Sequence, residues 1–133
     1  MAARIFLGLS ALLWLPYGIA CFLFPDLLAS EGSAGLVASN ATASTEIRAM
    51  YGGLQAAIGV FVGLAALRPR LVQPALLMTG FLTTGLFVSR FAGALVDGGF
   101  SAYTLMGLGF ELVSAGLAWW LLRREVGPPP LPA

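Results

Sequence analysis

Four long, mostly apolar segments separated by short polar stretches dominate the 133-residue chain. They cover residues 5–24, 47–67, 73–95 and 102–122. Each is close to the ~20 residues that an α-helix needs to cross the hydrocarbon core of a bilayer. The pattern predicts an all-α, polytopic membrane protein in which four transmembrane helices form a bundle. We expect this bundle to be a single domain over residues 1–126.

The polar stretches between the segments predict one long loop, two tight turns and a tail. Residues 25–45 are rich in Ser, Ala, Gly, Thr and Asn, which is typical of a loop in water. Residues 68–70 and 97–99 contain Pro or Gly-Gly, which end helices and favour turns. Residues 127–133 are rich in Pro, so we expect this tail to be extended and disordered.

The first apolar segment can also be interpreted as a signal peptide, with Gly18-Ile19-Ala20-Cys21 as a lipoprotein-type cleavage site. That site lacks the usual leading Leu, and apolar residues continue past it to Phe24. A signal peptide has a shorter apolar region followed by small residues at the cleavage site. We therefore favour a transmembrane helix.

Composition narrows the possible function classes. Of all residues 59% are hydrophobic and 10% are charged, whereas soluble domains carry roughly 25% charged residues. The expected surroundings are therefore the lipid bilayer, and without a basic patch we expect no nucleic-acid binding. The chain has no His, and Cys21 is its only Cys, so the commonest general base and the usual metal ligands are missing. We expect no enzyme activity, no catalytic residue, no cofactor and no metal site.

The positions of the arginines predict how the protein is oriented. Arg4, the 68–70 turn and the Arg123–Arg124 pair fall on one side of the predicted membrane. The 25–45 loop and the 97–99 turn fall on the other side and contain neither Arg nor Lys. Loops rich in Lys and Arg usually remain in the cytoplasm. Both termini are therefore expected to be cytoplasmic.

Three charged residues lie inside the predicted spans. Ser44 or Thr45 is expected to cap the second helix, which opens with Glu46-Ile47-Arg48-Ala49-Met50-Tyr51-Gly52-Gly53. At ~1.5 Å per residue, Arg90 and Glu111 lie roughly 9 and 13 Å below the predicted outer boundary. A lone charge at the bilayer centre costs on the order of 2.5–3.5 kcal/mol. We therefore predict that Glu111 pairs with Arg90, with Arg48 as a second partner.

The candidate site is a cluster in the outer leaflet that either binds a ligand or forms ion pairs. Steps of three or four residues place several polar and small side chains on one face of the second helix, where residues 59–63 form a GxxxG pattern that permits close contact with another helix. Ion pairs in a membrane can fix helix register, or they can mark a binding or proton-linked site. The cluster consists of Glu46, Arg48, Tyr51, Gln55, Arg90, Asp97 and Glu111, with Trp14 and Tyr17 on its apolar side.

The segment 46–53, the 67–70 loop, Arg90 followed by Asp97-Gly98, and Glu111 in the last helix carry a resemblance to a known family. Over nearly its whole length the chain resembles the DUF4345 family, small four-span bacterial membrane proteins of unknown function. It is also distantly similar in layout to DoxX-type four-helix membrane proteins. The resemblance implies a multi-pass protein of the bacterial inner membrane, and it transfers no catalytic residue because the family has no established activity.

Three functions compete on this basis. The first is a non-enzymatic binding or accessory subunit, which could be a homo-oligomer or part of a larger membrane complex. The second is a DoxX-like, redox-associated protein that binds a quinone or a lipid between its helices. The third is a small proton-coupled transporter with Glu111 as the carrier, although the sequence shows no internal repeat. A hydrolase is disfavoured, because the chain has no His and no Ser in a nucleophile motif.

Overall fold

The computed structural model describes residues 1–30 and 32–126. The tail that we expected to be disordered lies outside the described residues. The described residues form helices and connecting turns without any β-strand, which confirms the all-α prediction. In chain order the elements are α1 (Ala2–Leu23), η1 (Pro25–Leu28), α2 (Ala41–Ile47), η2 (Arg48–Gly53), α3 (Leu54–Leu67), η3 (Pro69–Leu71), α4 (Val72–Asp97) and α5 (Ala102–Val126).

Within residues 1–30 and 32–126, four helical stretches are long and apolar enough to cross a membrane, as predicted. They are α1, the continuous run α2–η2–α3, the run η3–α4, and α5. Their lengths and compositions indicate a multi-pass membrane protein. Below, the outer end is the end of the molecule that carries the loop after α1 and the turn after α4, which the arginine pattern predicts to face away from the cytoplasm.

The second helical run begins earlier than the sequence suggested. It starts at Ala41, and its N-cap is Asn40, whose Oδ1 accepts a hydrogen bond of 2.9 Å from the backbone N–H of Ala43. The expected caps, Ser44 and Thr45, instead lie inside the first turns. Thr45 Oγ1 donates to the Ala41 carbonyl at 2.9 Å. Asn is among the strongest N-cap residues, so it takes the position that a Ser or Thr could also have filled.

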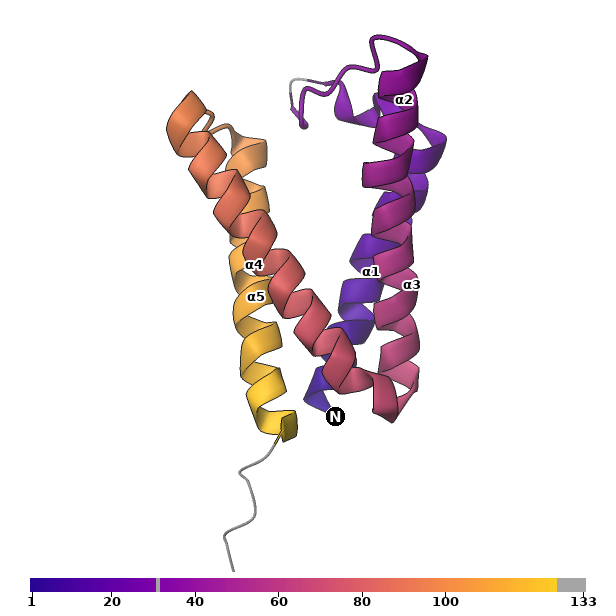
Figure 1. The fold of residues 1–133 in the computed structure, drawn as a ribbon, viewed down its shortest axis with the longest axis vertical. Coiled ribbons are helices and arrows are strands. Elements are labelled where there is room, and N and C mark those ends of the chain that lie inside the picture. Colours follow the sequence, from indigo (N-terminus) through magenta and orange to yellow (C-terminus); the bar gives the residue numbers. More distant parts are fainter. Residues whose placement is uncertain (31, 127–133) are drawn as a thin grey trace, which may run out of the picture.

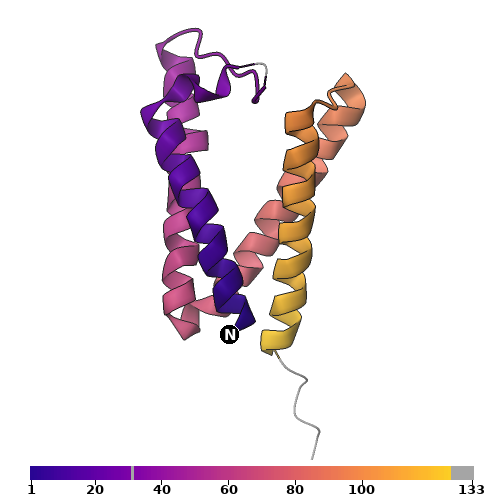
Figure 2. The same ribbon diagram turned by 180° about the vertical axis from the view of Figure 1, so that it is seen from behind.

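The long helices pair into two hairpins that diverge as the two arms of a V. The first hairpin, residues 2–67, pairs α1 with α3, and the second, residues 69–126, pairs α4 with α5. Figures 1 and 2 show the hairpins meeting at the end that carries the N-terminus and separating toward the outer end. The core joining them sits near the apex of the V, where all four long helices contribute: Ala3, Leu7, Trp14, Ile58, Val62, Ala65, Val72, Ala75, Leu76 and Leu121.

Glycines allow α1 and α3 to approach unusually closely. A Cβ added at Gly18 would lie 2.3 Å from the backbone N of Ala56, and one added at Gly59 would lie 2.5 Å from the backbone N of Leu15. Neither position can hold a larger residue unless the helices move apart. A Cβ at Gly63, the second glycine of the predicted GxxxG pattern, would lie 3.3 Å from its nearest neighbour on α1. The pattern therefore does mark a helix contact, as expected for small residues in membranes.

The η2 segment is a π-helix of six residues, Arg48–Gly53, inside the second span. Its hydrogen bonds run from i to i+5, so it holds about one more residue per turn than an α-helix. The side chains before it are therefore rotated relative to those of α3. Gly52 seats this segment on α1, because a Cβ there would lie 2.8 Å from Phe22 Cβ. The π-segment breaks the regular three-or-four spacing that had placed Arg48 and Gln55 on one face.

Candidate functional site

The predicted ion pair between Arg90 and Glu111 is present inside the second hairpin. Arg90 Nε donates to Glu111 Oε1 at 2.9 Å and to Oε2 at 3.1 Å, and Arg90 Nη2 donates to Oε1 at 2.7 Å. Glu111 is 2% exposed, and the Arg90 side chain is 32% exposed. Hydrogen bonds from a cation to both carboxylate oxygens fix the relative orientation of the two groups. The pair thus satisfies a buried carboxylate that would be costly in lipid if left alone.

A glycine on α5 makes room for this arrangement. Gly107 lies one turn before Glu111, and a Cβ added to it would lie 2.9 Å from Arg90 Nε. The guanidinium therefore rests where a larger side chain would stand. Gly107 shares a face of the last helix with Glu111, because the two are four residues apart, but this spacing alone gives it no role. The role of Gly107 follows from the Arg90 side chain, which reaches across from α4.

Aromatic side chains from both hairpins surround the pair. The rings of Trp14 on α1 and Phe110 on α5 lie 6.1 Å apart between centroids, so the hairpins touch beside Glu111. The phenol of Tyr17 interacts with that of Tyr103 on α5. Arg90 is close enough to Tyr103 and to Tyr51 for an electrostatic interaction with each.

Tyr103 belongs to the site, although the predicted cluster did not include it. With Gly107 and Glu111 it forms a stripe of residues four apart on α5, which places the three on one helix face. That spacing was the available signal. What the sequence could not give was the partner on α1, because the contact joins residues far apart in the chain.

One polar group near these tyrosines lacks a partner. Gln55 lies one helical turn after Tyr51, and its Oε1 is buried without a hydrogen bond from the described residues. An unsatisfied buried acceptor costs roughly 1–3 kcal/mol. Gln55 is thus an acceptor that a donor on a bound molecule could satisfy.

Arg48 does not join the cluster, so the prediction that it is the second partner of Glu111 is wrong. Its Nη1 donates to the backbone carbonyl of Phe22, and its guanidinium carbon lies 5.7 Å from the centroid of the Phe22 ring. Arg48 therefore caps the C-terminal end of α1, where carbonyls lack helical partners and a cation is favoured. The hairpins diverge toward the outer end, so Arg48 remains with the first hairpin while Glu111 belongs to the second.

The two outer acids are not drawn toward the pair either. Glu46 is exposed on α2, and Asp97 is the exposed last residue of α4, ahead of Gly98 in a left-handed conformation. In the described part of the chain neither acid forms an ion pair. Of the predicted cluster, the structure thus joins Arg90 to Glu111 and brings Tyr51 near enough to act on Arg90 electrostatically, whereas Glu46, Arg48 and Asp97 lie at the outer end.

No set of three His, Cys, Asp or Glu side chains comes together among the described residues. Cys21, the only Cys of the chain, lies on α1 and is buried in a cluster with Leu28 and Ile47. Glu111 is already engaged by three hydrogen bonds from Arg90. That the protein binds no metal stays a prediction, which metal analysis of the purified protein would check.

A comparison with protein families gives one match. A family model described as "Domain of unknown function (DUF4345)" matches residues 2–122, a range that includes the first three long helical runs, most of α5 and every residue of the site. No curated protein and no solved structure matches the chain. The family description names no activity, so any function has to be argued from the site.

Proposed function

The chain belongs to the DUF4345 family, and we propose that it is a non-enzymatic membrane protein that binds an amphiphilic small molecule between its two hairpins. The polar end of the molecule would meet Arg90 and the tyrosines, and its apolar part would lie among Trp14, Phe110 and lipid. We further propose that the protein resides in a bacterial inner membrane with both termini in the cytoplasm, as the arginine asymmetry favours.

The observation that carries the proposal is the unused donor capacity of Arg90. A guanidinium has five N–H donors, and the ion pair engages only Nε and Nη2. Nη1 donates to no group among the described residues, and the side chain is about a third exposed. The positive charge is already balanced by Glu111, so the pair offers N–H groups without demanding a further anion. A neutral molecule with a carbonyl oxygen, such as a quinone or an ester lipid, has the matching chemistry.

The neighbouring groups complete a mixed polar and aromatic lining. The hydroxyls of Tyr17, Tyr51 and Tyr103 can each donate or accept a hydrogen bond, and they come from α1, η2 and α5. Phe110, which is 40% exposed and packs against the buried Trp14 ring, offers flat apolar surface beside them. Binding sites for small molecules typically combine aromatic walls with a few convergent polar groups. The core that joins the hairpins lies near the apex of the V, so the outer halves can adjust around a ligand with little loss of packing.

Two other functions receive less support. An accessory subunit would use its exposed helix faces to contact another membrane protein, and the Arg90–Glu111 pair would then serve only the fold. A proton carrier must exchange protons with water on both sides of the membrane. Glu111 is buried and held by three hydrogen bonds from one arginine, which favours a fixed group over a carrier.

The proposal can be tested by identifying what accompanies the protein out of its own membrane. The full chain would be extracted with a styrene–maleic acid polymer, without detergent, and its lipids and quinones measured by mass spectrometry. We expect one quinone or lipid species to be enriched over the bulk membrane at near one per chain. The double change Arg90→Leu with Glu111→Leu should reduce this enrichment about tenfold, the effect of losing one or two hydrogen bonds.

Arg70→Gln is a matched control, because Arg70 is an exposed arginine at the opposite end of the molecule. It should leave the enrichment unchanged. An absence of any enriched species in the wild type, or equal enrichment in the double variant, would contradict the proposal. A second protein that co-purifies in constant ratio while no small molecule is enriched would favour the accessory subunit.

A further inference from the structure

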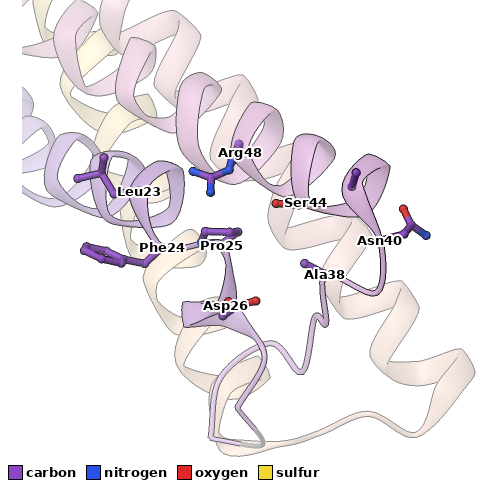
Figure 3. Close-up of a pocket in the computed structure, with 9 residues that line it drawn as sticks. Leu23, Phe24, Pro25, Asp26, Ala38, Asn40, Ser44 and Arg48 are labelled. Carbon is purple, nitrogen blue, oxygen red and sulfur yellow. The ribbon is translucent and has the colours of Figure 1, made fainter.

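A second polar site lies at the outer end of the first hairpin, apart from the Arg90–Glu111 pair. It is an open groove of about 510 Å³ between the end of α1 and the start of α2. Figure 3 shows Arg48 and Asp26 on opposite sides of Pro25, with the Ser44 hydroxyl to one side of them. The groove is lined by Leu23, Phe24, Pro25, Asp26, Ala38, Asn40, Ala41, Ser44 and Arg48.

The groove presents two opposite charges that do not neutralise each other. Arg48 gives one donor to the Phe22 carbonyl, and its other N–H groups donate to no group among the described residues. Asp26 is exposed. Arg48 and Asp26 form no ion pair with each other, although both line the same groove. A ligand that carries both a negative and a positive group could contact Arg48 and Asp26 at once.

We infer that this groove binds the headgroup of a zwitterionic phospholipid, with its phosphate on Arg48 and its primary ammonium on Asp26. A guanidinium is well suited to phosphate, because its planar fork can donate two parallel hydrogen bonds. The Ser44 hydroxyl provides a further donor beside it. A purely anionic headgroup would gain the Arg48 contact but would place negative charge against Asp26, which is unfavourable.

The position of the groove identifies the membrane as the source of the ligand. α1 ends at Leu23, so the groove opens where the first span leaves the apolar layer. Leu23 is 55% exposed and Phe24 is 64% exposed, and both line the groove. These apolar side chains would contact the glycerol and upper acyl region of a lipid whose phosphate reaches Arg48.

The simpler interpretation of Arg48 is that it only caps α1, and the inference is testable against it. The full chain would be reconstituted in nanodiscs of phosphatidylcholine containing equal amounts of phosphatidylethanolamine and phosphatidylglycerol. Lipids retained after detergent transfer would be counted by native mass spectrometry. We expect about tenfold more phosphatidylethanolamine than phosphatidylglycerol or phosphatidylcholine on the wild type.

Each variant tests a different contact of the proposed headgroup. Arg48→Gln should lower retention of phosphatidylethanolamine about tenfold, and Arg48→Lys should restore part of it. Asp26→Asn should remove the preference for phosphatidylethanolamine over phosphatidylglycerol while keeping a bound phospholipid. Arg68→Gln, an exposed arginine at the other end of the molecule, should change nothing. If Arg48→Gln disturbs folding, the helical circular dichroism signal will be lost. Asp26→Asn still tests the inference in that case, because Asp26 is an exposed side chain.

Several results would overturn the inference. Equal retention of the three lipids by the wild type would do so, as would a preference for phosphatidylglycerol or an unchanged preference in Asp26→Asn. Soluble phosphoethanolamine that displaced the lipid at equal concentration would show that the acyl region contributes nothing and that the ligand need not be a lipid. These outcomes do not bear on the Arg90 site, because the groove shares no residue with it.

Discussion

The two hairpins hold their helices together in lipid in different ways. In the first, glycines such as Gly18 and Gly59 bring the backbones of α1 and α3 into direct contact. In the second, side chains hold α4 to α5: Trp119 Nε1 donates to Thr84 Oγ1 at 3.1 Å, and its ring meets Phe81 edge-on at 5.0 Å. The Arg90–Glu111 pair adds a third side-chain contact.

This difference suggests where each hairpin can hold a ligand. In the first hairpin the polar side chains that bond to the facing helix, Arg4 and Arg48, lie near its two ends, and the middle packs through glycine backbone contact. Side-chain contact needs hydrogen bonds, and these are strong where water is excluded. Polar groups that stabilise the second hairpin can also face a ligand when their donors are not all used. Arg90 is in that position inside the second hairpin, and Arg48 is in that position at the outer end of the first.

The largest effect on stability should come from removing one partner of the ion pair. Glu111→Gln strands the charge of Arg90, and breaking such a pair costs about 3 kcal/mol, the lower end of the range for fully buried pairs because Arg90 is partly exposed. Unfolding of purified protein by titration with sodium dodecyl sulfate, followed by tryptophan fluorescence, would measure it. A loss below about 0.5 kcal/mol would mean that the second hairpin does not depend on the pair.

A somewhat smaller loss is expected from the first hairpin when its backbone contact is disturbed. Gly59→Ala places a methyl group 2.5 Å from the Leu15 backbone, and overpacking of this kind costs about 2 kcal/mol. Gly85→Ala is the matched control, because nothing lies within 4 Å of a Cβ at that helical position. It should be neutral or slightly stabilising. Equal effects of the two changes would argue against glycine-mediated contact between α1 and α3.

A smaller effect still is expected at Gly107, where the neighbour is a movable side chain. Gly107→Ala would push the Arg90 guanidinium from its place by a few tenths of an ångström, and we expect a loss of about 1 kcal/mol. The same change should weaken ligand enrichment, because the direction of the remaining Arg90 donors would shift. Gly116→Ala, on the same helix with open space around it, is the control for helix propensity. An equal loss of ligand enrichment in Gly107→Ala and Gly116→Ala would show that the effect does not act through Arg90.

The fourth test concerns orientation rather than stability, and it uses the loops that join the helices within and between the hairpins. Asn40→Cys and Pro69→Cys would be labelled separately in intact cells with a membrane-impermeant maleimide. Position 40 should react and position 69 should be protected, because the arginine pattern places the 68–70 turn in the cytoplasm. The native thiol, Cys21, is buried and provides the unlabelled background. Labelling at position 69 and protection at position 40 would reverse the proposed orientation.

Features that depend on neighbouring parts of the chain were predictable from the sequence. The four spans follow from the length of their apolar runs, and the Arg90–Glu111 pair follows from similar depth on two helices joined by a short turn. Features that depend on distant parts were not predictable. Arg48 was assigned to the cluster because a regular helix was assumed, but η2 alters the phase of the helix and the hairpins diverge. Tyr103 was missed because its partner lies on α1. The distant similarity to DoxX-type proteins stays a prediction, since no solved structure matches.

The central claim is that Arg90 and Glu111 act as a pair and that the pair faces a ligand. A double-mutant cycle, with unfolding measured in detergent and ligand enrichment measured in styrene–maleic acid extracts, tests it most directly. We expect Arg90→Leu and Glu111→Leu each to destabilise the protein by about 2–3 kcal/mol, and the double change to recover most of that loss, because no charge is then stranded. Ligand enrichment should remain low in the double variant. Additive losses of stability would show that the residues do not pair, and full ligand enrichment in a stable double variant would show that the pair serves only the fold.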